Sequence, residues 1–313
     1  MEIPVYLFTG LLESGKTTLI QEVVKDEDFL DPGTTVLVQC EEGEVSYSEE
    51  FLKEHDIVNI AVEDKDDLNE LFWRRCEKKY SPSQIMVEYN GMWEMDDFFE
   101  SGMPEHWFVG GIYSTVDGST AEVYLNNMRK TFMEPLRESN LIIFNRCDDD
   151  IDRLKFRRNL KAMNPQVQVV FERKDGTMFK DEAEVLPFDY SKETVEIEDM
   201  DYGLWYIDAT ENPGRYIGKK ISFNARYCAS MKPGEKYFVP GRHIMTCCEA
   251  DIQFLGFICY FDEAVPYQHG DWVHVTAEFD YGECEMYDED GPILRLVDIE
   301  PTAQPEQELV TFT

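Results

Sequence analysis

The sequence predicts an α/β domain followed by a small β-barrel domain. In residues 1–171, short apolar runs alternate with amphipathic helical segments, which is typical of a doubly wound, mostly parallel sheet. The glycine-bounded loop directly after the first run is typical of a P-loop, which such sheets use to bind phosphate groups. From residue 203 to 300 the pattern changes to short strand-like runs between Pro, Gly and Asp turns, which indicates a closed or half-closed barrel such as the OB fold.

The elements of the first domain follow from the period of their apolar residues. A buried strand begins at Ile3 and ends at the loop that starts with Gly10. Further strands are expected over residues 35–39, 57–62, 84–88, 106–117, 140–144 and 166–171. Helices are expected over residues 18–24, 66–79, 120–137 and 152–163, with a short helix or turn over 49–56.

Changes in composition set the expected domain limits. Residues 172–202 are charged and irregular and are expected to link the two domains. The strands of the barrel are expected over residues 217–226, 237–240, 256–261, 272–278 and 293–299. Residues 301–313 are polar and are expected to form a loose tail.

Composition excludes several classes of function. The 313 residues carry 29 Lys and Arg against 64 Asp and Glu, a net charge of −35, and both halves are acidic. Nucleic acid and anionic membrane surfaces are therefore not expected as partners, because binding to either depends on Lys and Arg. No apolar run approaches the roughly 20 residues of a membrane helix. The start lacks a signal-like segment and the eight cysteines are irregularly spaced, so we expect a cytoplasmic protein with free thiols.

The loop after the first strand reads Gly-x-x-x-x-Gly-Lys-Thr from Gly10 to Thr17. Gly10 and Gly15 let the backbone curl so that its N–H groups face phosphate oxygens, and the following helix adds the positive end of its dipole. Lys16 is expected to reach the terminal phosphates and the Thr17 hydroxyl to bind Mg2+. The other loop residues expected at the nucleotide are Glu13, Ser14 and Thr18. The alternative is a glycine-rich turn that merely precedes a helix.

A second motif, Asn145-Arg146-Cys147-Asp148, follows the strand expected over residues 140–144. An Asp carboxylate there can accept two hydrogen bonds from the N1–H and the amine of guanine, whereas adenine offers no such pair of donors. In this interpretation Asn145 braces the loop and the stem of Arg146 covers the base. The alternative for Asp148 is a cap for the next helix.

Residues 1–171 resemble the GTPase domain of the CobW family, relatives of the GTPases that insert nickel into urease and hydrogenase. The resemblance rests on six ordered matches: Gly10–Thr18, Glu41–Val45, Glu88-x-x-Gly91, Val116-Asp117, Asn145–Asp148 and Asn164-Pro165. It implies GTP as substrate and Mg2+ as cofactor. It also implies that Glu88 stands near Mg2+, that Gly91 offers its N–H to the γ-phosphate, and that Glu41 lies on a loop sensing nucleotide state. The expected catalytic residues are Lys16, Glu41 and Glu88, with Mg2+ held by Thr17, Glu41 and Glu88.

Several positions depart from the family pattern. Cys40 stands where the family has Asn before its switch glutamate, Arg146 replaces the usual Lys, and Glu13 adds a negative charge to the phosphate loop. The family's Cys-x-Cys-Cys metal motif is absent, since residues 60–67 contain no cysteine. We therefore expect that metal transfer, if this chain performs it, uses other residues, and that Glu13 either points to solvent or weakens nucleotide binding.

The second domain offers a different set of metal-ligating residues. Residues 203–300 resemble the C-terminal domain of a bacterial family described as permease subunits, through the stretch Met245–Asp251, Gly256 and Asp271–Val273. The residue types suit Zn2+, since thiolates with a nearby imidazole and carboxylate are its usual ligands. The candidate ligands are His243, Cys247, Cys248 and Asp251. The alternative for the cysteines is burial as small apolar residues.

These patterns support two main hypotheses of function. The first is a Mg2+-dependent GTPase that couples nucleotide state to delivery or sensing of a transition metal, with zinc favoured and a metal-receiving client protein or a homodimer as partner. The second is a nucleotide-gated scaffold with little hydrolysis, whose barrel recognises a protein. An ATP-dependent small-molecule kinase is a weaker third, because Asp148 would then have no base to recognise.

Overall fold

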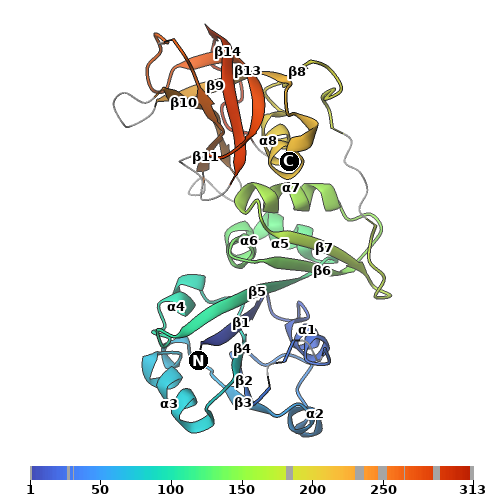
Figure 1. Ribbon diagram of the computed structural model, residues 1–313. Helices are drawn as coiled ribbons and strands as arrows, with labels where there is room; N and C mark the ends of the chain where they lie inside the picture. The colour runs from blue at the N-terminus through green and yellow to red at the C-terminus, as the bar shows by residue number, and fades with distance from the viewer. Residues whose placement is uncertain are drawn as a thin grey trace. The chain divides into compact units, whose positions relative to one another are not determined.

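The computed structural model describes residues 2–26, 29–30, 32–180, 186–229, 236–245, 252–263, 265–284 and 290–310 (Figure 1). The chain forms two compact units, one of residues 1–153 and 166–181 and the other of residues 154–165 and 182–313. Most of helix α7 (Arg153–Met163) therefore belongs to the second unit. The domain limits expected from the sequence stay a prediction. Among the described residues, no helix is both long and apolar enough to cross a membrane.

The first unit contains a parallel sheet of seven strands in the order β3-β2-β4-β1-β5-β6-β7. The strands are β1 Ile3–Thr9, β2 Thr35–Gln39, β3 Ile57–Ala61, β4 Gln84–Glu88, β5 Trp107–Asp117, β6 Leu141–Cys147 and β7 Gln168–Arg173. The prediction of a doubly wound parallel sheet is confirmed. After β4 the chain crosses β1 to form β5 on its other side, and ligands of such sheets bind at the carboxyl ends of strands around this reversal.

Helices cover both faces of this sheet. The helices are α1 Lys16–Val23, α2 Glu49–Glu54, α3 Glu70–Tyr80, α4 Met95–Phe99, α5 Ala121–Asn127 and α6 Arg129–Arg137, with a 3-10 turn η1 at Lys65–Asp67. Ile20 of α1 packs with Phe8 and Leu37 on one face. Trp73 of α3 packs with Leu7 and Val38 on the other. The strand residues alternate between these two cores, as the period of a strand requires.

The helix expected over residues 120–137 is interrupted in the structure. Met128, between α5 and α6, has φ −135° and ψ 39°, which lies outside the helical region. The side-chain amide of Asn127 donates a hydrogen bond to the Val123 carbonyl at 2.8 Å. Side-chain amides that bond the backbone in this way compete with the helix. The single-helix prediction is therefore wrong at this point, although the helical type is correct on both sides.

The second unit is built on a closed five-stranded barrel. Its strands are β9 Lys220–Ala229, β10 Tyr237–Met245, β12 Ile258–Tyr260, β13 Trp272–Gly282 and β14 Gly291–Pro301. They follow each other around the barrel in the order β9-β10-β12-β14-β13, and the pairing of β9 with both β10 and β13 closes the ring. β12 and β14 are parallel and the other pairs antiparallel. The barrel prediction is confirmed, and two short strands, β8 Thr194–Glu196 and β11 Ile252–Gly256, extend it.

Helix α8 (Tyr202–Glu211) was not expected from the sequence. Trp205 lies fully buried on it, with its ring centroid 5.0 Å from that of Phe223 and 5.6 Å from that of Phe257. Seven of its ten residues are buried, so the segment has no polar face and no helical period to detect. Trp205 thus belongs to the core of the second unit and reaches it from a helix.

The end of the chain also differs from the expectation of a loose tail. Residues 302–310 return to the barrel, where Val310 pairs with Ile244 of β10 and is only 4% exposed. Val310 contributes apolar surface to the core of the second unit, which ties this segment down.

Candidate functional site

The loop between β1 and α1 is held close to the ends of two neighbouring strands. Gly10 has φ +129° and Gly15 φ +102°, in the left-handed region that glycine tolerates. A Cβ atom on Gly10 would lie 2.2 Å from the Thr115 carbonyl oxygen of β5, and one on Gly91 would lie 2.1 Å from the Gly10 carbonyl oxygen. The three glycines therefore let the loop pass between β5 and the segment after β4. This geometry leaves room for the curled backbone that a P-loop needs.

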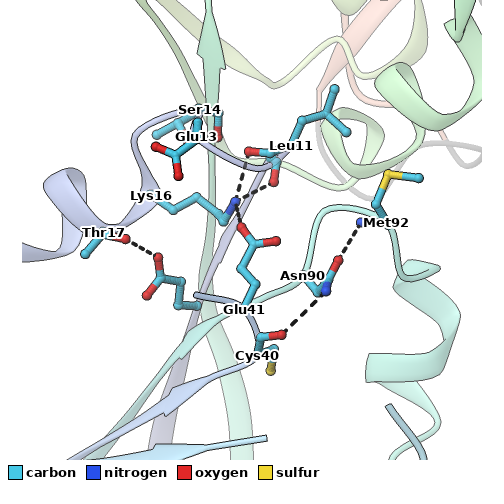
Figure 2. A network of polar contacts seen from close by, with 12 residues as sticks. Leu11, Glu13, Ser14, Lys16, Thr17, Cys40, Glu41, Asn90 and Met92 are labelled. Atoms are coloured by element: carbon cyan, nitrogen blue, oxygen red, sulfur yellow. Dashed lines mark hydrogen bonds and ion pairs between the residues drawn. The ribbon is translucent and has the colours of Figure 1, made fainter. Parts of the chain in front are cut away.

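Lys16 is the buried cation of this loop. Its Nζ donates hydrogen bonds to the carbonyl oxygens of Gly10 at 2.7 Å and Leu11 at 3.0 Å, and it forms an ion pair with Glu41 (Figure 2). The two charged side chains are only 2% and 10% exposed. A buried ammonium is costly without an anionic partner, so Glu41 satisfies it here. A phosphate group that binds Lys16 must replace Glu41 or share the ammonium with it.

Thr17 and the end of β4 supply oxygen ligands next to Lys16. The Thr17 hydroxyl donates to Glu88 Oε1 at 2.5 Å, and the Tyr47 hydroxyl donates to Glu88 Oε2 at 2.7 Å. Burial raises the pKa of Glu88, although both hydrogen bonds act to lower it. A hydroxyl and two carboxylates, those of Glu41 and Glu88, are the hard oxygen donors that Mg2+ prefers. These residues therefore fit the cofactor expected from the sequence, and they line one small pocket together with Lys16.

The segment after β2 is connected to both neighbouring loops. Glu13, whose φ is +63°, accepts the backbone N–H of Glu44 with its Oε1 at 2.7 Å. On the other side, the Asn90 side-chain amide donates to the Cys40 carbonyl at 3.5 Å (Figure 2). The Glu13 carboxylate is thus directed at the backbone of Glu44 and not at Lys16. It joins the phosphate loop to residues 41–45, which we call the switch loop.

Cys40, directly before the switch loop, is a buried thiol. Burial, and then the charges of Glu88 and Glu41, raise its pKa to about 12. Without a bound cation the thiol therefore stays protonated at neutral pH. Six cysteines among the described residues are free thiols: Cys40, Cys76, Cys147, Cys228, Cys259 and Cys284.

The segment after β6 reaches the phosphate loop from the opposite side. The Asn145 side-chain amide donates to the Ser14 carbonyl at 2.7 Å, and Arg146 Nη1 donates to the Glu13 carbonyl at 2.8 Å. The same nitrogen of Arg146 pairs with Asp117 Oδ2 at 2.7 Å. Asn145 Oδ1 is buried and has no hydrogen-bond partner within the described chain. A buried acceptor of this kind is usually satisfied by an ordered water molecule or by a bound ligand.

Asp148, the residue expected to recognise the base, has a partner of its own. Lys174 Nζ donates to its two carboxylate oxygens at 2.6 Å and 2.7 Å, and both side chains are more than half exposed. Lys174 was not singled out from the sequence, because it lies in a charged irregular segment. The sequence analysis also missed Tyr47 and the Ser14–Thr115 hydroxyl contact of 2.7 Å, which joins the loop to β5.

The candidate zinc ligands are only partly within the described residues. His243 lies on β10, half-buried, with its ring centroid 5.2 Å from that of Phe254. Cys247, Cys248 and Asp251 lie outside the described residues. In the described ranges no group of three or more His, Cys, Asp and Glu side chains is placed to hold a metal ion. The zinc site therefore stays a prediction.

Comparison with known families agrees with this geometry. Residues 4–171, more than half of the chain, match the model of the CobW/HypB/UreG nucleotide-binding domain. The chain belongs to the CobW/HypB/UreG family. Residues 174–311 match the DUF1980 C-terminal domain. Both resemblances seen in the sequence are therefore confirmed, and the first unit of this family member is a P-loop domain of the GTPase class.

Three solved structures illustrate what this CobW-type chain is similar to. Zn(II)-bound YjiA GTPase from E. coli is 16% identical, with a TM-score of 0.43 and coverage of 74% of each chain. Hydrogenase maturation factor HypB from Archaeoglobus fulgidus is 15% identical, with a TM-score of 0.39, and covers 56% of this chain and 84% of its own. HypB from Helicobacter pylori in complex with nickel is 9% identical, with a TM-score of 0.38, and covers 54% and 78%. No curated protein matches the chain.

The Asp117–Arg146 pair predicts a pH-dependent contribution to the stability of this CobW-type domain. Burial tends to raise the Asp117 pKa, but hydrogen bonds from Ser119 and Arg146 outweigh it and hold the pKa below its usual value. The ionised carboxylate therefore stabilises the fold above pH of about 4, and this contribution is lost as the pH falls through the lowered pKa. Asp117→Asn should cost about 1 kcal/mol at pH 7 and progressively less below pH 4, measured by urea unfolding.

Asp149→Asn is the matched control, because Asp149 also pairs with an arginine, Arg173, but is 86% exposed. Exposed pairs contribute little, so its unfolding free energy should stay close to that of the wild type. An Asp117→Asn effect that is the same at pH 7 and below pH 4 would contradict the assignment.

Proposed function

We propose that this chain binds GTP with Mg2+ and hydrolyses it slowly, and that its nucleotide state controls the delivery or sensing of a transition metal, with zinc as the candidate. The observation that carries the nucleotide part is the convergence of the phosphate loop and the switch loop on one buried ammonium. Lys16 lies among the carbonyls of its own loop, with Glu41 from the switch loop opposite it. Membership of the CobW/HypB/UreG family supports the same assignment.

In this proposal Lys16 exchanges its carboxylate partner for phosphate oxygens. The backbone N–H groups of the phosphate loop add further donors, and the N-terminus of α1 contributes its dipole. Mg2+ would be held by Thr17 and Glu88, with Glu41 as a further ligand, and would neutralise charge on the phosphates. Phosphoryl transfer needs little covalent chemistry from the protein, so positioning and electrostatics would account for most of the rate.

The exchange at Lys16 also gives the switch loop a reason to move. Glu41 is held by Lys16 in one contact, and Glu44 is held by Glu13 in another. When a phosphate group binds the Lys16 ammonium, Glu41 loses its partner, whereas the hydrogen bond from Glu44 to Glu13 stays in place. The switch loop would then rearrange around the Glu13 contact. A loop with two alternative partners is the kind of two-state element that nucleotide switches use.

Guanine recognition in this proposal falls to the segment after β6. Asn145 and Arg146 already contact the phosphate loop, which places Asp148 at the same edge of the sheet. Asp148 would accept the two donors of guanine and release Lys174. Adenine has no matching donors, so the preference for GTP depends on this carboxylate.

The metal part of the proposal rests on sequence and on family membership. The candidates are His243, Cys247, Cys248 and Asp251, a donor set that suits Zn2+. A client protein would receive the metal, and a homodimer is a further possibility of the same proposal.

One observation favours a second candidate, a nucleotide-gated scaffold with little hydrolysis. Glu41 neutralises Lys16, and Glu13 ties the switch loop to the phosphate loop. Both contacts oppose nucleotide entry and loop movement. In a scaffold these contacts would set the nucleotide concentration that is needed for binding. The barrel would recognise a protein partner.

Glu41→Gln separates these roles of the switch loop. The neutral side chain leaves the Lys16 charge free for phosphate, so affinity for the nucleotide measured without Mg2+, where the loss of Glu41 as a metal ligand has no effect, should rise about tenfold, or about 1.4 kcal/mol. If Glu41 also acts in catalysis, phosphate release per bound GTP should fall.

Glu42→Gln is the control, because Glu42 is exposed and adjacent in sequence. Calorimetry with a non-hydrolysable GTP analogue and a phosphate-release assay give the two readouts. Unchanged affinity would contradict the exchange, and no phosphate release from the wild type would favour the scaffold.

Asp148→Asn tests the preference for guanine. GTP affinity should fall about tenfold or more while ATP affinity stays the same, because only guanine loses a charge-assisted pair of hydrogen bonds. Lys174→Ala should raise GTP affinity by at most about fivefold, since an exposed ion pair contributes about 1 kcal/mol or less. Asp150→Asn, an exposed neighbour, is the control. Equal losses for GTP and ATP would show that Asp148 does not recognise the base.

Zinc binding to the full chain tests the metal part. Calorimetry should show a Zn2+ site in the wild type that is lost in Cys247→Ser/Cys248→Ser, and its affinity should differ between GTP-bound and GDP-bound protein. Cys228→Ser is the control for a thiol outside the set. If Zn2+ binds the double variant as it binds the wild type, metal delivery through these cysteines is wrong.

A further inference from the structure

The last described segment of the chain lies on the barrel as an added strand. The Val310 N–H donates to the His243 carbonyl at 3.0 Å, and the Met245 N–H donates to the Val310 carbonyl at 3.1 Å. This pairing with β10 is parallel. The Val310 side chain is 4% exposed and joins the core of the second unit. The contact therefore combines main-chain pairing with one apolar anchor, as in peptide recognition by strand addition.

Two arginines of the barrel hold the residues just before Val310. Arg242, which is 0% exposed, donates from Nη2 to the Gln307 carbonyl at 2.7 Å and from Nη1 to Asp199 Oδ1 at 2.9 Å. Arg226 forms an ion pair with the Glu308 carboxylate. One arginine thus holds the main chain of the segment and the other holds its acidic side chain.

This basic site has more donors than its present partners use. Both guanidinium groups lie over the Trp272 ring, 5.1 Å and 5.2 Å from its centroid. The Nε atoms of Arg226 and Arg242 and the Nε1 of Trp272 are buried without a hydrogen-bond partner among the described residues. Unpaired buried donors are uncommon in native proteins and favour ligands that bring acceptors. In a chain with a net charge of −35, two arginines concentrated at one site mark it as a place for an acidic ligand.

The segment can leave without opening the barrel. The ring β9-β10-β12-β14-β13 closes through pairings that do not involve residues 302–310, and β10 keeps β9, β11 and β12 as neighbours. The segment joins the barrel through β14, which ends at Pro301. Its release would therefore expose the edge of β10 at His243–Met245 together with the two arginines.

We propose that Arg226, Arg242, Trp272 and the edge of β10 form a peptide-binding site, for which residues 307–310 are the resident ligand. The ligand class is an extended acidic peptide with Glu two positions before an aliphatic residue, as in Glu308-Leu309-Val310. A partner protein that carries such a segment displaces the tail and takes its place. None of these residues is part of the proposed nucleotide site, and the peptide site uses the main chain of His243, whose side chain is one of the zinc candidates.

Tethering sets how strongly a partner must bind. The tail is linked to its site by a few residues, which corresponds to an effective concentration on the order of 1 mM. A free peptide with the same sequence therefore competes poorly against the intact chain and well against a chain whose tail has been cut and removed. This difference distinguishes an exchangeable ligand from a permanent part of the fold.

The test uses the full chain with a protease site introduced at Ala303-Gln304, folded first and then cut. Fluorescence anisotropy follows a labelled peptide with the sequence of residues 304–313. The cut chain should bind the peptide at least about tenfold more tightly than the intact chain, because the tethered competitor is gone. The matched peptide with Glu308→Gln should bind the cut chain at least about fivefold more weakly, and added salt should reduce this difference.

Three outcomes would overturn the proposal. If the cut chain neither binds nor exchanges the peptide while its circular dichroism spectrum is unchanged, the segment is not a ligand. If cutting unfolds the second unit, the segment is a structural part of the barrel. If the Glu308→Gln peptide and a scrambled peptide bind as well as the native sequence, the arginines do not select an acidic segment.

Discussion

The ion pair between Lys16 and Glu41 is the contact on which the first unit depends. It joins the ends of β1 and β2, the two strands whose loops carry the phosphate-binding and switch segments. Two charges this deeply buried are tolerated only as partners, and removing either one leaves the other uncompensated. The same requirement explains how a ligand could act on the fold. In the proposed function, an anion at Lys16 releases Glu41, and the switch loop then takes another arrangement.

Hydrogen bonds around this ion pair fix the positions of Glu88 and of the phosphate loop. Glu88 is held by Thr17 and Tyr47, while Asn145 and Arg146 hold the phosphate loop from the side of β6. The carbonyl acceptors of the loop are thereby largely occupied, whereas its backbone N–H groups are the donors that a phosphate needs. The arrangement suits an anion in the loop and a hard cation beside it. In an acidic protein, such a local concentration of donors is the feature that selects a phosphate ligand.

Much of the first unit could be predicted because its signals are local. Gly10, Gly15, Lys16 and Thr17 lie within eight residues, and the strands are short apolar runs that end at the same edge of one sheet. The contacts of Glu13 with Glu44 and of Lys174 with Asp148 join residues 31 and 26 positions apart, and nothing in their local sequence indicates them. Helix α8 was missed because it is buried on nearly all sides and has no amphipathic period. The attachment of the tail was missed because Arg226 and Arg242 become its partners only once the barrel has closed.

The central claim is that nucleotide replaces Glu41 at Lys16, and a crystal structure of the full chain with Mg2+ and a non-hydrolysable GTP analogue tests it most directly. The account predicts that Lys16 Nζ lies within hydrogen-bond distance of the terminal phosphates and that the Glu41 carboxylate has moved away from Lys16 toward Mg2+. A complex in which the Lys16–Glu41 ion pair is intact and the phosphates contact neither residue would contradict it.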